Sequence, residues 1–175
     1  CLCGVGRPWY RASVDGVSAQ TAAQTLGPTM GVQFAFVYSH RPSPAEVGSW
    51  ERSLTVLSND LHDAGLDQVE ILLEYRLPLT SRRVDAVLCG MHPKTADSSY
   101  VVVELKQWSR ATVVDGTDDV VLDDGRGRRL HPAAPVGRCC ESLGDFHASP
   151  RGTAAPHPGV AISPTATADH RSARA

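Results

Sequence analysis

A strongly capped helix followed by three short apolar runs is the feature that most constrains the fold of this chain. Ser43 is a candidate N-cap, Pro44 occupies the first helical position, and Glu46 stands three residues after Ser43, which is the pattern of a capping box. Apolar residues then recur at spacings of three and four up to Gly65: Val47, Trp50, Leu54, Leu57 and Leu61. We therefore expect one amphipathic helix after Ser43 that ends before Gly65 and packs on a sheet.

Three segments with strand character follow this helix. Residues 68–77, 82–90 and 99–108 are rich in β-branched and aliphatic side chains, and turn or loop residues separate them. Short connections of this kind favour antiparallel neighbours. The sequence thus predicts a helix followed by an antiparallel three-strand meander.

Charged residues interrupt the second and third segments. Glu104 and Lys106 alternate with Val103, so they should share one face of their strand. Asp85 alternates with Ala86 and should lie on the opposite face from it, where an antiparallel neighbour would bring it near Glu104. Lys106 is one of only two lysines in a chain with fifteen arginines, which favours a specific need for an ammonium. Two carboxylates and an amine are therefore expected to converge.

Such a group suits metal-assisted phosphoryl chemistry. The carboxylates of Asp85 and Glu104, with the backbone carbonyl of Leu105, offer the hard oxygen ligands that Mg²⁺ or Mn²⁺ prefers. The ammonium of Lys106 could orient a water molecule and stabilise charge that develops on a phosphoryl group. The alternative is an outward-facing Glu104–Lys106 pair on a half-solvated strand, worth no more than about 1 kcal/mol.

The order Asp85, then Glu104-Leu105-Lys106, after a helix and an opening strand, resembles the PD-(D/E)XK, restriction-endonuclease-like nucleases. The longer string SWERSL…VEILLEYRLPLTSRRVDAVL…YVVVELKQW is similar to the N-terminal domain of bacterial Schlafen group 3-like DNA/RNA helicases, a domain related to the NERD nucleases. The resemblance implies an α/β (α+β) fold with a restriction-endonuclease-like core. In that core the helix and the meander join a mixed sheet flanked by helices.

The same resemblance implies a site and partners. Asp85 and Glu104 would be metal ligands, Lys106 the catalytic lysine, and an acid on the first helix, Glu51 or else Glu46, an auxiliary residue. The implied function is Mg²⁺- or Mn²⁺-dependent hydrolysis of DNA phosphodiester bonds, with an ATP-dependent helicase domain as partner in the full-length protein. No G-x-x-x-x-G-K-[ST] phosphate loop occurs here, so the sequence predicts no ATPase in this chain.

Departures from the related pattern keep alternatives open. Related nucleases often have Q-x-x-x-Y on the helix after the motif strand, where this chain has Pro135 and Cys139. The alternatives are a catalytically inactive nuclease-fold module that binds nucleic acid or a partner, and a non-functional fragment. Arg83 and its neighbour Arg82 could hold phosphates or flank a solvated turn, and Glu74 is expected on the solvent face of its strand.

Composition sets the expected boundaries. Residues 1–31 are expected to be poorly defined, residues 32–147 to form the nuclease-like domain, and residues 148–175, rich in Pro, Ala, Ser and Thr, to be a disordered tail. The net charge of −2 gives no bulk attraction for nucleic acid. No apolar run approaches the roughly 18 residues of a membrane span, so no membrane association and a cytoplasmic location are expected.

Overall fold

The structure is a computed structural model, and it describes part of the chain. The described residues are 8–77, 82–91, 94, 96, 98–106, 111–113, 119–122, 128–130, 136–140 and 159–162.

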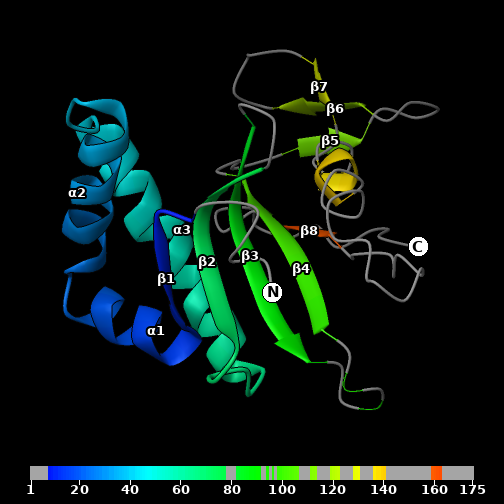
Figure 1. Cartoon of the computed structure of the whole chain (residues 1–175). Helices are drawn as coiled ribbons and strands as arrows, with labels where there is room; N and C mark the ends of the chain where they lie inside the picture. Colours follow the sequence, from blue (N-terminus) through cyan, green and yellow to red (C-terminus); the bar gives the residue numbers. More distant parts are fainter. Residues whose placement is uncertain are drawn as a thin grey trace.

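A five-stranded sheet forms the centre of the molecule, with the strand order β1-β2-β3-β4-β8 (Figure 1). Its strands are β1 (Tyr10–Ser13), β2 (Glu70–Arg76), β3 (Arg83–Met91), β4 (Ser98–Leu105) and β8 (Gly159–Ile162). The first four strands are antiparallel, and β8 pairs parallel to β4. The predicted meander is therefore confirmed, within a mixed α/β fold.

Helices cover both faces of this sheet (Figure 1). Three helices lie on the same side: α1 (Val14–Ala22), α2 (Leu26–Tyr38) and α3 (Pro44–Asp63). The short helix of residues 136–140 lies on the other side. A second, three-stranded antiparallel sheet consists of β5 (Ala111–Val113), β6 (Asp119–Leu122) and β7 (Arg128–Leu130).

Helix α3 forms as its sequence predicts. The Ser43 hydroxyl accepts a hydrogen bond from the Glu46 N–H at 3.2 Å, and Glu46 Oε2 accepts one from the Ser43 N–H at 3.0 Å. Gly65 follows the helix with a φ of +71°, a conformation that glycine adopts without steric cost. The apolar stripe of Trp50 and its neighbours is buried against the sheet, so the periodicity of α3 fixes which of its faces is inside.

The sheet separates two hydrophobic clusters. The helix-side cluster lies between the sheet and α1–α3, and it takes Ile71 and Leu73 from β2 and Val103 from β4. The opposite cluster takes Leu72 and Val102 from the same strands and packs them against the helix of residues 136–140. These two clusters serve below to show which face a strand residue occupies.

The expected poor definition of residues 1–31 is wrong for the described part of that segment. Residues 10–31 form β1, α1 and the first part of α2, and the proposed boundary at residue 32 falls inside α2. Val14, Val17 and Met30 are almost fully buried in the helix-side cluster. Helix α2 carries no charged side chain, so it has no polar stripe from which an amphipathic helix could be recognised.

The expected disorder of residues 148–175 is wrong for residues 159–162. These residues form β8, in which Val160 pairs with Val103 and Ile162 pairs with Leu105. The pairing partner lies more than fifty residues earlier in the chain, which a local composition argument does not see. The rest of this tail lies outside the described residues.

Candidate functional site

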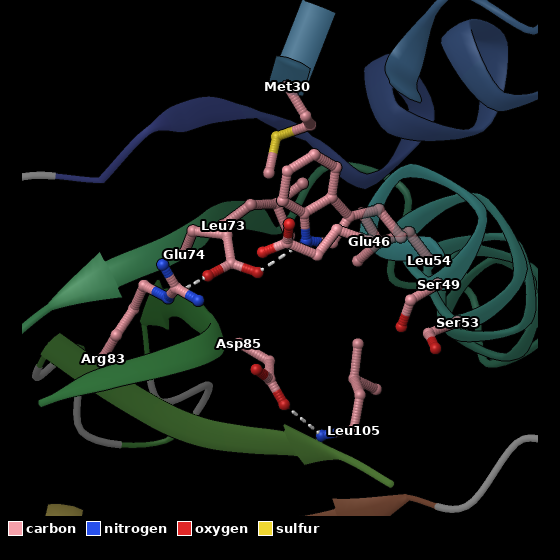
Figure 2. Close-up of a pocket in the computed structure, with 11 residues that line it drawn as sticks. Met30, Glu46, Ser49, Ser53, Leu54, Leu73, Glu74, Arg83, Asp85 and Leu105 are labelled. Carbon is pink, nitrogen blue, oxygen red and sulfur yellow. Dashed lines mark hydrogen bonds and ion pairs between the residues drawn. The ribbon is translucent and has the colours of Figure 1, made fainter. Parts of the chain in front are cut away.

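One end of the central sheet collects most of the charged residues of interest. Strands β2 and β4 end there, and β3 and α3 begin there. These four termini surround a cavity of about 200 Å³, shown in Figure 2. The cavity is lined by Met30, Glu46, Ser49, Trp50, Ser53, Leu54, Leu73, Glu74, Arg83, Asp85 and Leu105.

Strand β2 changes its facing pattern at this end. Leu73 belongs to the helix-side cluster, and Tyr75 belongs to the opposite cluster. Glu74, between them, has a φ of +51° and lines the helix-side cavity next to Leu73. A non-glycine residue in this left-handed region costs about 1–3 kcal/mol, and it persists where surrounding contacts hold it. Two consecutive residues of β2 thus face the helices.

Strand β3 makes the same change directly opposite. Ala86 pairs with Leu73 and shares its cluster, whereas Val84 pairs with Tyr75 and shares the other one. Asp85 lies between them and lines the helix-side cavity. The predicted placement of Asp85 on the face opposite Ala86 is therefore wrong, because the alternation of β3 breaks at the position facing Glu74.

Glu74 is buried and held by two partners. Its carboxylate accepts a hydrogen bond from the Trp50 Nε1–H at 2.9 Å. Its other oxygen forms an ion pair with the Arg83 guanidinium, but the two groups are not oriented for a hydrogen bond. Burial raises the pKa of Glu74 to about 7, against the opposing effect of the Arg83 charge. The expectation of a solvent-facing Glu74 is wrong, since the residue is only 5% exposed.

Asp85 is partly buried and points toward β4 (Figure 2). Its Oδ2 accepts a hydrogen bond of 2.6 Å from the Leu105 N–H, just beyond the last regular pair of these strands, Ala86 with Val103. Burial raises the pKa of Asp85 to about 6, and the negative charge of Glu104 adds to this effect. The Leu105 hydrogen bond and the Lys106 charge work in the opposite direction.

Glu104 and Lys106 form an ion pair with each other. Val103 and Leu105 pack with the helix-side cluster and Val102 with the opposite one, so the alternation of β4 places Glu104 on the side of Val102. The charge of Glu104 also raises the pKa of Cys139, after the larger effect of burial. Glu104 is therefore near the helix of residues 136–140.

Asp85 and Glu104 consequently approach the end of β4 from opposite faces of the sheet. They are close enough for Glu104 to raise the pKa of Asp85, but they do not share the face that the sequence predicted. Within the described residues, no group of three or more His, Cys, Asp or Glu side chains is arranged to hold a metal ion. Leu105, expected to offer its carbonyl to a metal, is seen to donate its N–H to Asp85.

The two candidate acids on α3 lie at different places. Glu46 lines the cavity together with Asp85, while its Oε2 completes the helix cap. Glu51 lies against Gly27, where even a Cβ atom would overlap its carboxylate, and it lines a separate cavity with residues of α1 and α2. The structure thus brings Glu46 to the site, and it does not bring Glu51 there.

Arg83 is the residue at this site whose environment the sequence did not reveal. Its guanidinium lies over the Trp9 ring, 4.5 Å from the centroid, and its Nη1 is 3.3 Å from the Tyr38 hydroxyl oxygen. Together with the Glu74 ion pair, these contacts join Trp9, just before β1, and the elements α2 and β2 to the start of β3. Only the position of Arg83 two residues before Asp85 could have indicated its proximity to the site.

Two of the remaining expectations concern the helix after the motif strand and the membrane. Cys139 is buried in the opposite cluster, and Pro135 lies outside the described residues. Over the residues that the structure describes, no helix has the length and apolar character needed to cross a bilayer.

Comparisons of the chain with protein-family models, with curated proteins and with solved structures find no match.

Proposed function

We propose that this chain is a metal-dependent, nuclease-like domain that hydrolyses DNA phosphodiester bonds on a restriction-endonuclease-like core. The observation that carries the proposal is the position of Asp85, a partly buried carboxylate near the start of β3 whose pKa depends on the charges of Glu104 and Lys106. The order α3, β2, β3, β4 and the parallel pairing of β8 support the proposed core. In a longer protein, this domain would act beside an ATP-dependent helicase domain.

The donor set has the right chemistry for Mg²⁺ or Mn²⁺. Asp85 and Glu104 supply carboxylate oxygens. Ala86 pairs with Val103, and one further step in this register would place Asp85 across from Glu104 on the neighbouring strand. A cation, when bound, would neutralise the two carboxylates and polarise a phosphodiester group. Glu46, on the first turn of α3, adds a third acid on the helix side of the cavity.

The residues of the chain have separate roles in this proposal. Asp85 is oriented by the Leu105 N–H, which fixes one of its oxygens and leaves the carboxylate at the end of the β3–β4 pairing. Lys106, which forms an ion pair with Glu104, would stabilise charge on the phosphoryl oxygens. Glu46 would orient water on the helix side of the site.

A nuclease assay with a titration of Mg²⁺ or Mn²⁺ tests the proposal. The intact chain should cleave a DNA substrate in a metal-dependent way, and Asp85→Asn should remove both cleavage and metal affinity. Glu51→Gln is a control, because Glu51 is an acid of α3 that lines a separate cavity. Equal loss in both variants, or unchanged cleavage in Asp85→Asn, would contradict the assignment of Asp85.

A specific observation favours a second candidate function. Lys106 is paired with Glu104, and Asp85 and Glu104 occupy different faces, so the three residues are not convergent as they stand. An inactive nuclease-fold module that binds nucleic acid would keep this arrangement. Salt-sensitive DNA binding without cleavage at any metal concentration would favour this candidate.

A further inference from the structure

An aromatic and cationic surface lies beside the cavity, at the carboxyl end of α2. Tyr38 is 45% exposed, although its ring packs edge-on against Trp9 at a centroid distance of 5.4 Å. Its hydroxyl oxygen is 3.3 Å from the guanidinium of Arg83, which itself lines the cavity. This surface is therefore continuous with the site that contains Asp85.

The helix end adds a second ring to this surface. Ser39 has a φ of +60° and ends α2, which turns the chain back over the helix. His40 then lies 5.0 Å from Phe34 and 6.2 Å from Tyr38, measured between ring centroids, and it is exposed to solvent. The left-handed turn at Ser39 thus places an imidazole beside the Tyr38 ring.

Arg83 is held in a fixed orientation at the edge of this surface. The Trp9 ring supports its guanidinium from one side, and Glu74 pairs with it from β2. Its side chain is nevertheless 34% exposed. A guanidinium held by such contacts loses less conformational entropy when it binds a further group.

We propose that Tyr38, His40 and Arg83 form a subsite that stacks an unpaired base of single-stranded DNA next to the Asp85 cavity. The choice of nucleic acid as ligand rests on the proposed function. Exposed aromatic rings beside an arginine are the usual platform for unpaired bases, whose ring faces are open. In a duplex these faces are covered by neighbouring base pairs, so the subsite selects single strands.

Charge on the neighbouring residues is consistent with this ligand. The cavity carries the acids Glu46, Glu74 and Asp85, so without a bound cation, as in EDTA, a phosphate is expected outside it rather than within it. Arg41 follows His40 directly in the chain, which places a further positive charge next to the stacking rings. The base therefore meets Tyr38 and His40, and the backbone meets the arginines.

The same helix supplies a matched control. Phe36 is 86% exposed and lies two residues before Tyr38, so it projects from the other side of α2. Removal of its ring changes the exposed aromatic area of the helix without touching the proposed subsite.

The test is fluorescence anisotropy of a labelled oligodeoxythymidylate with the full chain in EDTA, so that no cleavage occurs. Tyr38→Leu, which keeps an apolar side chain against Trp9, should weaken binding by about five- to a hundredfold, the usual effect of losing one stacked base. Tyr38→Phe should bind nearly as well as the original chain, and so should Phe36→Leu. Thermal melting confirms that each variant is folded.

The possible outcomes separate this inference from the proposed function. Selective loss in Tyr38→Leu supports the subsite even where a metal titration shows no cleavage. Equal affinities of Tyr38→Leu and Phe36→Leu would overturn it, and so would a duplex of the same length that binds as tightly and depends equally on Tyr38. DNA cleavage that is metal-dependent, with single-strand binding unaffected by Tyr38→Leu, would retain the nuclease and reject the subsite.

Discussion

The two faces of the sheet place neighbouring acids in different environments. On the helix side, Glu74 and Asp85 share a cavity, and burial is the main cause of the raised pKa of each. On the opposite side, Glu104 forms an ion pair with Lys106 close to solvent, with side chains 16% and 27% exposed. Glu74 and Asp85 therefore resist ionisation, whereas the charge of Glu104, nearby in the same sheet, is balanced by Lys106.

The difference has a local backbone cause. The left-handed conformation of Glu74 interrupts the alternation of β2, and β3 follows at the paired position. Without that interruption Asp85 would face the same side as Glu104. The facing of a single residue on β2 thus decides whether the acids of β3 and β4 converge.

The largest expected effect concerns cleavage by the proposed nuclease. Asp85→Asn and Lys106→Ala should each lower the rate of metal-dependent DNA cleavage by at least about a hundredfold, because each removes charge at the phosphoryl group. Only Asp85→Asn should also weaken metal binding, measured by isothermal titration with Mn²⁺. A Lys106→Ala variant that loses metal affinity as strongly as Asp85→Asn would show that the lysine organises the site rather than the reaction.

The next effect concerns folding stability. Glu74→Ala leaves the buried Trp50 N–H without its acceptor and Arg83 without its counter-ion, which should destabilise the fold by about 2–4 kcal/mol. Glu104→Ala removes an ion pair whose carboxylate is more exposed than that of Glu74, and it should cost no more than about 1 kcal/mol. Urea unfolding of both variants measures the difference. Similar losses in the two variants would remove the distinction between the two faces.

The pH dependence of stability sharpens the same comparison. The pKa values of Glu74 and Asp85, about 7 and about 6, are raised above those of ordinary carboxyl groups, so the folded state holds protons that the unfolded chain has released. Their contribution is complete below about pH 4 and is lost as the pH rises to about 7, with a slope of up to about 1.4 kcal/mol per pH unit for each group. Glu74→Gln should flatten the unfolding free energy between about pH 5 and pH 7, whereas Glu104→Gln, which only removes a smaller contribution to the raised pKa of Asp85, should flatten it less. A slope that Glu74→Gln leaves unchanged would mean that other groups carry it.

Much of the fold could be predicted from local patterns. The capping box at Ser43 and the apolar stripe around Trp50 identify α3, and the runs of β-branched residues identify β2, β3 and β4. Helix α2 and strand β8 were missed for physical reasons. Helix α2 carries no charged side chain to mark a polar face, and β8 is a four-residue strand whose partner is distant in sequence.

The site was harder to predict than the fold. Period-two alternation correctly separates Val103 and Leu105 from Val102, but it misplaces Asp85 and Glu74. The left-handed conformation of Glu74 cannot be predicted from the residue type, because the contacts of its side chain with Trp50 and Arg83 hold it. Those contacts join segments that are separate in the sequence, so only tertiary structure reveals them.

The smallest expected effect tests the position of Glu104 directly. Burial and then the charge of Glu104 raise the pKa of the Cys139 thiol, while Asp85 is the weakest of its causes. Glu104→Gln should lower that pKa, increase the thiolate fraction and speed alkylation of Cys139 by less than about tenfold at mildly alkaline pH. Asp85→Asn should change the rate less, because Asp85 is on the other side of the sheet. Mass spectrometry of the peptide that carries Cys139 and Cys140 follows the reaction with iodoacetamide, and Cys89 in the same sample provides an internal reference. A larger acceleration in Asp85→Asn than in Glu104→Gln would place the two acids the other way round and reverse the comparison of the two faces.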